Sequence, residues 1–230
     1  MNLSKKIVSV AAAAALVAGA GAMAAAPAQA KGPQPKGATV IAVPLTLVGA
    51  AVQAGVTVAP IDPAKAEATS EVVGLVFPVS GPLMDGVVHH KGGLSFTSSK
   101  TGVVLTFSNP TIEYATSGGT TAEIKGTIEG IPADNPLAQV NGTRVALLTI
   151  DNFKVTNKQG KITKDGKKGY KRTVTQTITG EAKISSVGLL VDAVNALMGA
   201  PGLFTAGMDF GAVESEWSIT KTCKTKKACQ

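Results

Sequence analysis

Apolar and polar residues alternate along much of this chain, and that two-residue period limits its fold more than any other feature. Over 122–129, every second residue is apolar or glycine, and the positions between them are charged or carry a hydroxyl group. The same alternation recurs over 94–97, 105–108 and 213–219. A two-residue period is typical of strands with one buried face in an antiparallel sheet. We therefore expect a β-dominated domain, an antiparallel β-sandwich with one or two short helices.

One segment departs from the alternation. From Val187 to Met198, apolar residues recur at intervals of three and four. This spacing predicts an amphipathic helix near residues 186–199, which Gly199 and Pro201 end. A second, brief helix is expected over 48–55.

The dipeptide Asn141-Gly142 is a strong signal for a two-residue hairpin turn. It predicts one strand over 137–140 and a second strand over 144–150.

The first thirty residues indicate export. Lys5 and Lys6 precede a long run dominated by Ala and Gly, and Ala28-Gln29-Ala30 has the small-x-small form of a cleavage site. We predict a signal peptide over 1–30 that is cleaved near Ala30, so that the protein is secreted or envelope-associated. The mature chain then has no transmembrane segment. A retained membrane anchor is the alternative, because the apolar run is about long enough to span a bilayer.

The mature chain is long enough for one domain. We expect a polar Pro/Gly linker over 31–38, a single β-rich domain over 39–220 and a basic C-terminal tail over 221–230. Cys223 and Cys229 are the two cysteines of the chain. In an oxidising compartment they are expected to form a disulfide bond, since their spacing is not that of a C-x-x-C redox pair.

Residues 154–172 are rich in Lys and Gly, and they predict a long exposed hairpin. The hairpin is either a solvated loop or a contact with an anionic cell-wall polymer or lipid surface. Its candidate contact residues are Lys161, Lys164, Lys167 and Lys168. Nucleic acid is not an expected partner, because the basic residues are not interleaved with aromatic ones.

The sequence does not predict an enzyme. His89 and His90 are adjacent, so on a strand they point to opposite faces and do not bind one metal ion together. Carboxylates such as Glu113 and Glu129 leave a secreted hydrolase as an alternative, although nothing singles out a catalytic pair. The leading prediction is a non-catalytic binding or structural module of unknown ligand, without metal or cofactor.

Three segments carry a resemblance to a known family. They are Phe77-Pro78-Val79-Ser80-Gly81, the stretch 90–96 with His90-Lys91-Gly92-Gly93-Leu94, and the stretch 105–112 with Leu105, Phe107, Pro110 and Ile112. This pattern resembles the HtaA-type domain of haem-uptake surface proteins of high-GC Gram-positive bacteria.

The resemblance implies a β-rich exported domain and, as an alternative function, haem binding in iron uptake. In such domains a Tyr from an N-terminal helix ligates the iron, and the His of the H-x-G segment supports it. His90 matches that His, but residues 31–76 contain no Tyr. Tyr114 is therefore the second candidate haem contact of this alternative. The other interpretation of His90 is an ordinary histidine of the strand surface or core.

Overall fold

The computed structural model describes residues 36–84, 86–115, 119–166, 169–186 and 188–230. Within these residues the β-dominated class, the antiparallel pairing and the short helices predicted from the sequence are confirmed. The strands are β1 (Lys36–Pro44), β2 (Val56–Ile61), β3 (Lys65–Ala68), β4 (Val72–Met84), β5 (Val87–His90), β6 (Gly93–Ser98), β7 (Val104–Tyr114), β8 (Ala122–Glu129), β9 (Arg144–Gln159), β10 (Thr163–Lys164), β11 (Tyr170–Ile184) and β12 (Asp209–Cys223). The helices are α1 (Leu45–Gln53), α2 (Gly188–Leu197) and the 3-10 turns η2 (Ala138–Val140) and η4 (Lys227–Cys229).

These strands form one sheet that closes on itself, in place of the two separate sheets of the predicted sandwich. The order β7-β5-β4-β1-β12-β11-β9-β8 returns to its start because β8 also pairs with β7. The bend that closes the ring lies in β7, where the register shifts between Ser108 and Thr111. Asn109 there has φ 49°, and Pro110 has no N–H for the ladder. On one edge β7 therefore pairs first with β6 and then with β5.

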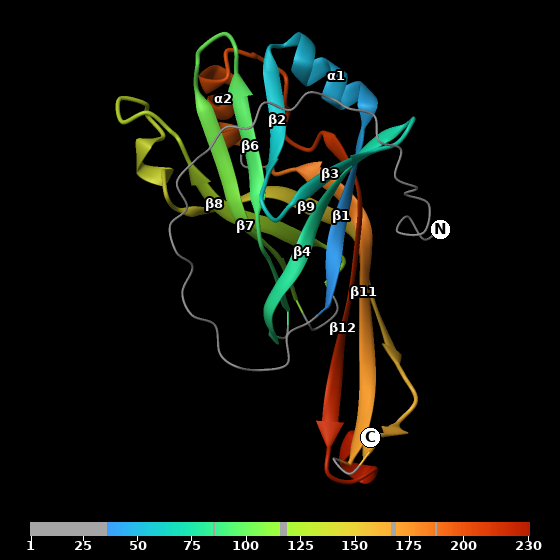
Figure 1. Cartoon of the computed structure of the whole chain (residues 1–230). Coiled ribbons are helices and arrows are strands. Elements are labelled where there is room, and N and C mark those ends of the chain that lie inside the picture. Colours follow the sequence, from blue (N-terminus) through green and yellow to red (C-terminus); the bar gives the residue numbers. More distant parts are fainter. Residues whose placement is uncertain (1–35, 85, 116–118, 167–168, 187) are drawn as a thin grey trace.

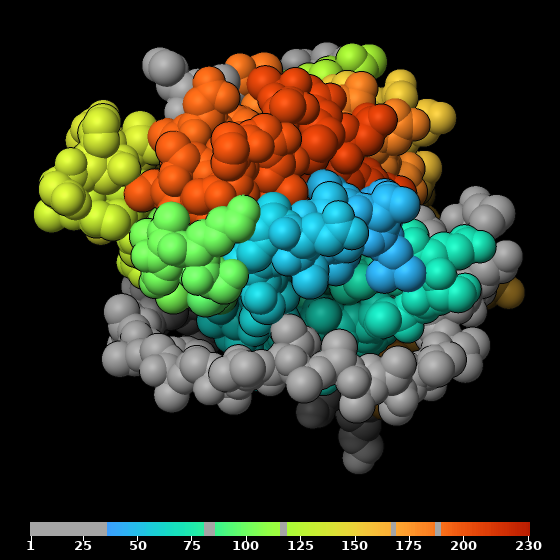
Figure 2. Space-filling model, turned by 90° about the horizontal axis from the view of Figure 1, so that it is seen from above, coloured from blue at the N-terminus to red at the C-terminus, as the bar shows by residue number. Residues whose placement is uncertain are grey.

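The inside of the ring is an aliphatic and aromatic core, and helices gather at one end of it. Trp217 of β12 is buried in this core. The helix predicted near 186–199 is present as α2, and its inner face packs on the core. Figures 1 and 2 show α1, α2 and the turn between β6 and β7 together at this end. That turn is tied to α2, because the hydroxyl groups of Ser98 and Thr101 donate to the carbonyl oxygens of Met198 and Leu197.

At the opposite end, β9, β11 and β12 continue beyond the ring as an arm (Figure 1). The neighbour β8 pairs with β9 only as far as Ile150, and β1 pairs with β12 only as far as Ser218. The three strands nevertheless stay paired with one another as far as Gln159 and Cys223. The expected basic hairpin over 154–172 is part of this arm.

The hairpin predicted at Asn141-Gly142 is only half present. Residues 137–140 are not a strand, because a loop with the 3-10 turn η2 links β8 to β9. The side chain of Asn135 caps the N–H of Leu137 at 2.9 Å and starts this turn. Gly142, at φ 76°, donates its N–H to Ile128 at 2.7 Å and leads the chain into β9. The turn signal was therefore correct for the start of β9 and wrong for the preceding strand.

The domain boundaries differ in detail from those expected. β1 starts at Lys36, so residues 36–38 of the predicted linker are strand, and β12 runs to Cys223. The predicted signal peptide over 1–30 lies outside the described residues. Within the described residues, no helix has the length and apolar character that crossing a bilayer requires.

Candidate functional site

His90 is the last residue of β5, and it is buried in the core with 5% of its surface exposed. Its Nε2 lies 2.6 Å from Oγ1 of Thr39 on β1, and its Nδ1 lies 3.1 Å from the carbonyl oxygen of Pro110 on β7. A carbonyl oxygen only accepts, so Nδ1 carries a proton and donates it to Pro110. Thr39 is also 2.6 Å from the hydroxyl oxygen of Ser215 on β12. Both ring nitrogens are thus engaged inside the protein.

Burial controls the protonation of His90. Loss of solvent lowers the pKa of His90 to about 4, although the carbonyl of Pro110 opposes the shift; the nearby His89 lowers the pKa further. The side chain is therefore neutral at neutral pH. Together with Thr39 it links four strands of the ring by hydrogen bonds, and it carries no charge into the core.

The residues that carry the HtaA resemblance meet around His90. A cavity of about 20 Å³ lies beside the imidazole of His90. Its lining includes Phe77 from the first segment, Leu94 from the second, and Phe107, Pro110 and Ile112 from the third. The three segments are separated along the chain but contribute to the lining of one cavity in the core.

Tyr114 lies elsewhere on the sheet. It follows Pro110 by four residues on β7, and at a rise of about 3.3 Å per residue that separates the two by roughly 13 Å along the strand. The ring of Tyr114 packs against Phe153, with the ring centroids 5.0 Å apart. The structure therefore does not bring His90 and Tyr114 together around one point.

A second cavity, of about 50 Å³, lies beneath α2. Its wall is mainly apolar and includes Leu190, Val191 and Phe204, and it shares Phe107 and Phe210 with the cavity beside His90. Pockets for small organic ligands are about 300–1,000 Å³. Both cavities are therefore gaps in packing. Within the described residues, no group of three or more His, Cys, Asp or Glu side chains is placed to hold a metal ion.

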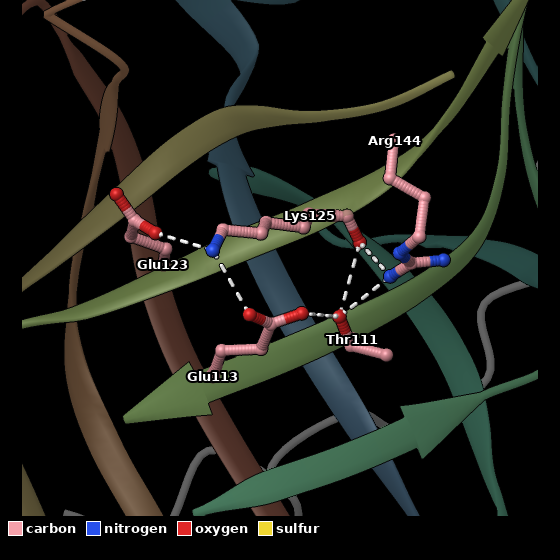
Figure 3. A network of polar contacts seen from close by, with 5 residues as sticks. All are labelled: Thr111, Glu113, Glu123, Lys125 and Arg144. Atoms are coloured by element: carbon pink, nitrogen blue, oxygen red, sulfur yellow. Dashed lines mark hydrogen bonds and ion pairs between the residues drawn. The ribbon is translucent and has the colours of Figure 1, made fainter. Parts of the chain in front are cut away.

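A polar network crosses β7, β8 and β9 on the outside of the ring (Figure 3). Lys125 contacts Glu113 and Glu123, each at 2.9 Å. Thr111 donates to Glu113 at 3.0 Å and accepts from Arg144 at 2.7 Å. Burial acts to raise the pKa of Glu113, but hydrogen bonds from Lys125 and Thr111 and the charges of Lys125 and Arg144 outweigh it and lower the pKa. A lowered pKa suits an ion pair and not a general acid.

The arm carries the other predicted contact residues. We define it as residues 154–166, 169–175 and 218–230. Lys161 and Lys164 are exposed on it, whereas Lys167 and Lys168 lie outside the described residues. The predicted disulfide bond between Cys223 and Cys229 is present at the tip of the arm.

Charge is strongly separated between the arm and the rest of the molecule. Among the described residues, the arm has one acidic side chain, Asp165, and ten basic ones: Lys154, Lys158, Lys161, Lys164, Lys171, Arg172, Lys221, Lys224, Lys226 and Lys227. The remaining described residues, which we call the body, have seven basic and thirteen acidic side chains. The net charge of the whole sequence does not reveal this separation of charge, because the basic arm and the acidic body partly cancel. Only strand pairing shows that 154–172 and the C-terminal tail share one basic surface.

Comparison with known proteins finds matches among solved structures. No protein family and no curated protein matches the chain. Among solved structures, it is similar to the heme binding protein HtaB from Corynebacterium glutamicum, with 16% identity and a TM-score of 0.49 over 82% of this chain and 96% of that chain. It is also similar to the C-terminal domain of HtaA from the same organism, with 10% identity and a TM-score of 0.47 over 81% of this chain and 99% of that chain.

Proposed function

We propose that this protein is an exported, non-catalytic module that attaches to the anionic surface of a cell envelope through its basic arm. The observation that carries the proposal is the separation of charge between arm and body. Phosphate groups attract the arm and repel the acidic body, so attachment has a defined direction. The leader-like residues 1–30 are the sequence feature that favours export.

Some of the side chains that an enzyme could use hold structural contacts. His90 is neutral and has both ring nitrogens engaged. Glu113 is ion-paired, and Asp151, another carboxylate, lies 2.9 Å from Lys183. General acid–base catalysis needs a group with access to substrate and a pKa near the working pH. These contacts support a binding role over a hydrolytic one.

Binding to phosphate-bearing particles tests the proposal. The probes are phosphatidylcholine vesicles with and without phosphatidylglycerol, and inorganic polyphosphate. The arm variant replaces six lysines by Gln: Lys158, Lys161, Lys164, Lys224, Lys226 and Lys227. A body variant replaces three other exposed lysines, Lys65, Lys91 and Lys100, by Gln. We expect the wild-type protein to bind an anionic probe at low salt and to release it as salt increases, because screening weakens the attraction.

The arm variant should lose this binding, and the body variant should retain it. Equal binding by the arm variant and the wild-type protein would overturn the proposal, as would binding that salt does not weaken.

Haem capture is the second candidate, favoured because the residues of the HtaA resemblance surround His90 and because HtaB is named a heme binding protein. The described side chains do not fit a haem iron as they stand. The nitrogens of His90 are occupied, Tyr114 is distant along β7, and the adjoining cavity of about 20 Å³ is far smaller than an organic ligand pocket.

A haem titration followed by absorbance separates the two candidates. The proposed attachment role predicts no Soret band of a specific complex. A saturable band that is lost in His90→Ala but kept in His89→Ala would establish haem capture instead.

A further inference from the structure

The C-terminal ring closed by Cys223 and Cys229 forms the outer end of the arm. Cys223 ends β12 opposite Tyr170 of β11. Cys229 is 2% exposed, and its sulfur lies 3.7 Å from the carbonyl oxygen of Tyr170. The ring is therefore folded back onto β11 and has a fixed position on the arm.

Arg172 on β11 fixes the ring a second time. Its guanidinium donates to the carbonyl oxygens of Cys229 and Gln230 at 3.1 and 2.9 Å, and to that of Gly160 at 3.2 Å. It also donates to the side-chain oxygen of Gln159. These contacts use most of the donors of the guanidinium. Arg172 thus joins the end of β9 to the disulfide-closed ring. Because most of its donors are used in these contacts, the lysines of the arm are the groups available to a ligand.

The lysines at the outer end of the arm lie close to other positively charged side chains. Lys221 is the cross-strand partner of Arg172, and like charges in directly opposite positions destabilise a sheet. Lys224, Lys226 and Lys227 follow within the ring, and all three are exposed. Among the described residues, Lys171 is the arm lysine with a carboxylate partner, Asp165 at 3.4 Å. Among the described side chains, the ring lysines thus have no carboxylate partner within ion-pair distance.

From this arrangement we infer that the disulfide-closed ring is the contact face of the arm and that it binds a linear polyanion of repeated phosphate groups. The inference rests on the proposed function and specifies its partner. Lysine ammonium groups bind phosphate oxygens as point charges and suit a chain of repeated phosphates.

The positions of the exposed apolar side chains favour a soluble polymer over a lipid bilayer as the partner. In the described part of the chain, the large apolar side chains that are exposed are Leu45, Val52 and Val104, and all three lie outside the arm. Stable insertion at a membrane surface needs apolar residues that enter the acyl boundary. The contact face offers charge alone, which a soluble polyanion satisfies.

Two triple variants and a cysteine variant test the ring. The ring variant replaces Lys224, Lys226 and Lys227 by Gln. The loop variant replaces Lys158, Lys161 and Lys164 by Gln, and the body variant of three lysines serves as the control. The last variant is Cys223→Ser/Cys229→Ser. Trp217 fluorescence and thermal unfolding show that the body of each variant is folded.

Binding of inorganic polyphosphate is measured over a range of salt. We expect the ring variant to bind about tenfold more weakly and to reduce the slope of log K against log salt by about 2–3, as for three lost phosphate contacts. The loop variant should change the affinity less, and the body variant should not change it. The cysteine variant should bind several-fold more weakly, because its freed lysines must be ordered on binding.

Other outcomes overturn the inference in distinguishable ways. If the loop variant loses as much affinity as the ring variant, or if the cysteine variant binds like the wild-type protein, the ring is not the contact face, while attachment by the arm still stands. If phosphatidylglycerol vesicles are bound more tightly than polyphosphate, the partner is a bilayer. If neither triple variant alters binding, the arm is not the attachment surface and the proposed function fails as well.

Discussion

The ring of Phe107 on β7 lies directly over Gly126 on β8, in the space that a side chain at position 126 would occupy. A Cβ atom added at Gly126 would be 2.5 Å from Cζ of Phe107 and 2.7 and 2.9 Å from its Cε atoms. Phe107 lines both cavities of the core. The absence of a side chain at Gly126 therefore positions the aromatic ring that separates α2 from the surroundings of His90.

Gly126→Ala should destabilise the fold by about 1–3 kcal/mol, because the buried ring of Phe107 has to move. Gly49→Ala is the matched control, since no atom lies within 4 Å of its added Cβ in α1. That substitution should stabilise the protein by up to about 1 kcal/mol through helix propensity. Urea denaturation measures both free energies of unfolding. Equal effects of the two substitutions would contradict the packing described for Phe107.

His90 should make stability depend on pH. Its pKa is about 4 in the folded protein, against 6.5 for the free side chain. Between these values the unfolded chain binds the proton and the folded chain does not, so the free energy of unfolding falls as the pH falls. The stabilising contribution of neutral His90 is complete above pH 6.5 and is lost toward pH 4, by about 3 kcal/mol in total.

Measuring the unfolding free energy of the wild-type protein and of His90→Gln at several pH values isolates this effect. Gln does not titrate, so the difference between the two proteins should shrink as the pH decreases from 6.5 to 4. A constant difference over that interval would show that His90 titrates normally.

Asn195 of α2 holds the loop that follows the helix. Its Nδ2 donates to the carbonyl oxygen of Phe204 at 2.7 Å, and its Oδ1 accepts from the N–H of Phe204 at 3.0 Å. Asn195→Ala leaves two buried backbone groups unpaired and should cost about 2–4 kcal/mol. Asp192→Ala, at an exposed position of the same helix, should change stability by less than about 0.5 kcal/mol. Thermal unfolding of the pair is the measurement, and comparable losses would mean that this double hydrogen bond is not important.

The ion pair of Lys125 and Glu113 should contribute modestly. Both side chains are about one-third exposed, at 31% and 33%. A double-mutant cycle with Lys125→Met and Glu113→Gln should give a coupling energy of about 0.5–1 kcal/mol that decreases with added salt. Because the pKa of Glu113 is lowered, the coupling is present above the ordinary carboxyl pKa and is lost as the pH falls through the lowered value. A coupling that persists below that range would need another cause.

The alternation of the sequence was sufficient to predict the strands but not the way in which they close. Within 122–129 the buried and exposed residues follow the expected period. The closure depends on where β7 changes partner, at Asn109 and Pro110. A local pattern contains information about faces and none about which distant strand completes the ladder. A sandwich and a closed ring therefore have the same signature along the chain.

The candidate site residues also include some that local sequence predicts and others whose position depends on contacts between distant segments. The disulfide bond between Cys223 and Cys229 and the exposed basic hairpin follow from local sequence, and the structure contains both. The core position of His90 between Thr39 and Pro110 depends on contacts between distant segments. The joining of the loop lysines to those of the C-terminal ring requires the pairing of β11 with β12, which no local pattern specifies.

Closure of the ring also has a consequence for solubility. A sheet whose last strand returns to its first presents few free backbone edges to other molecules, and free edges are the usual starting points of aggregation. One edge left open is that of β9 in the arm, where Lys154 and Lys158 are exposed. Charged residues on an edge hinder the addition of a further strand. Neutralising the arm lysines would therefore carry a second effect, a greater tendency of the protein to self-assemble through the open edge of β9.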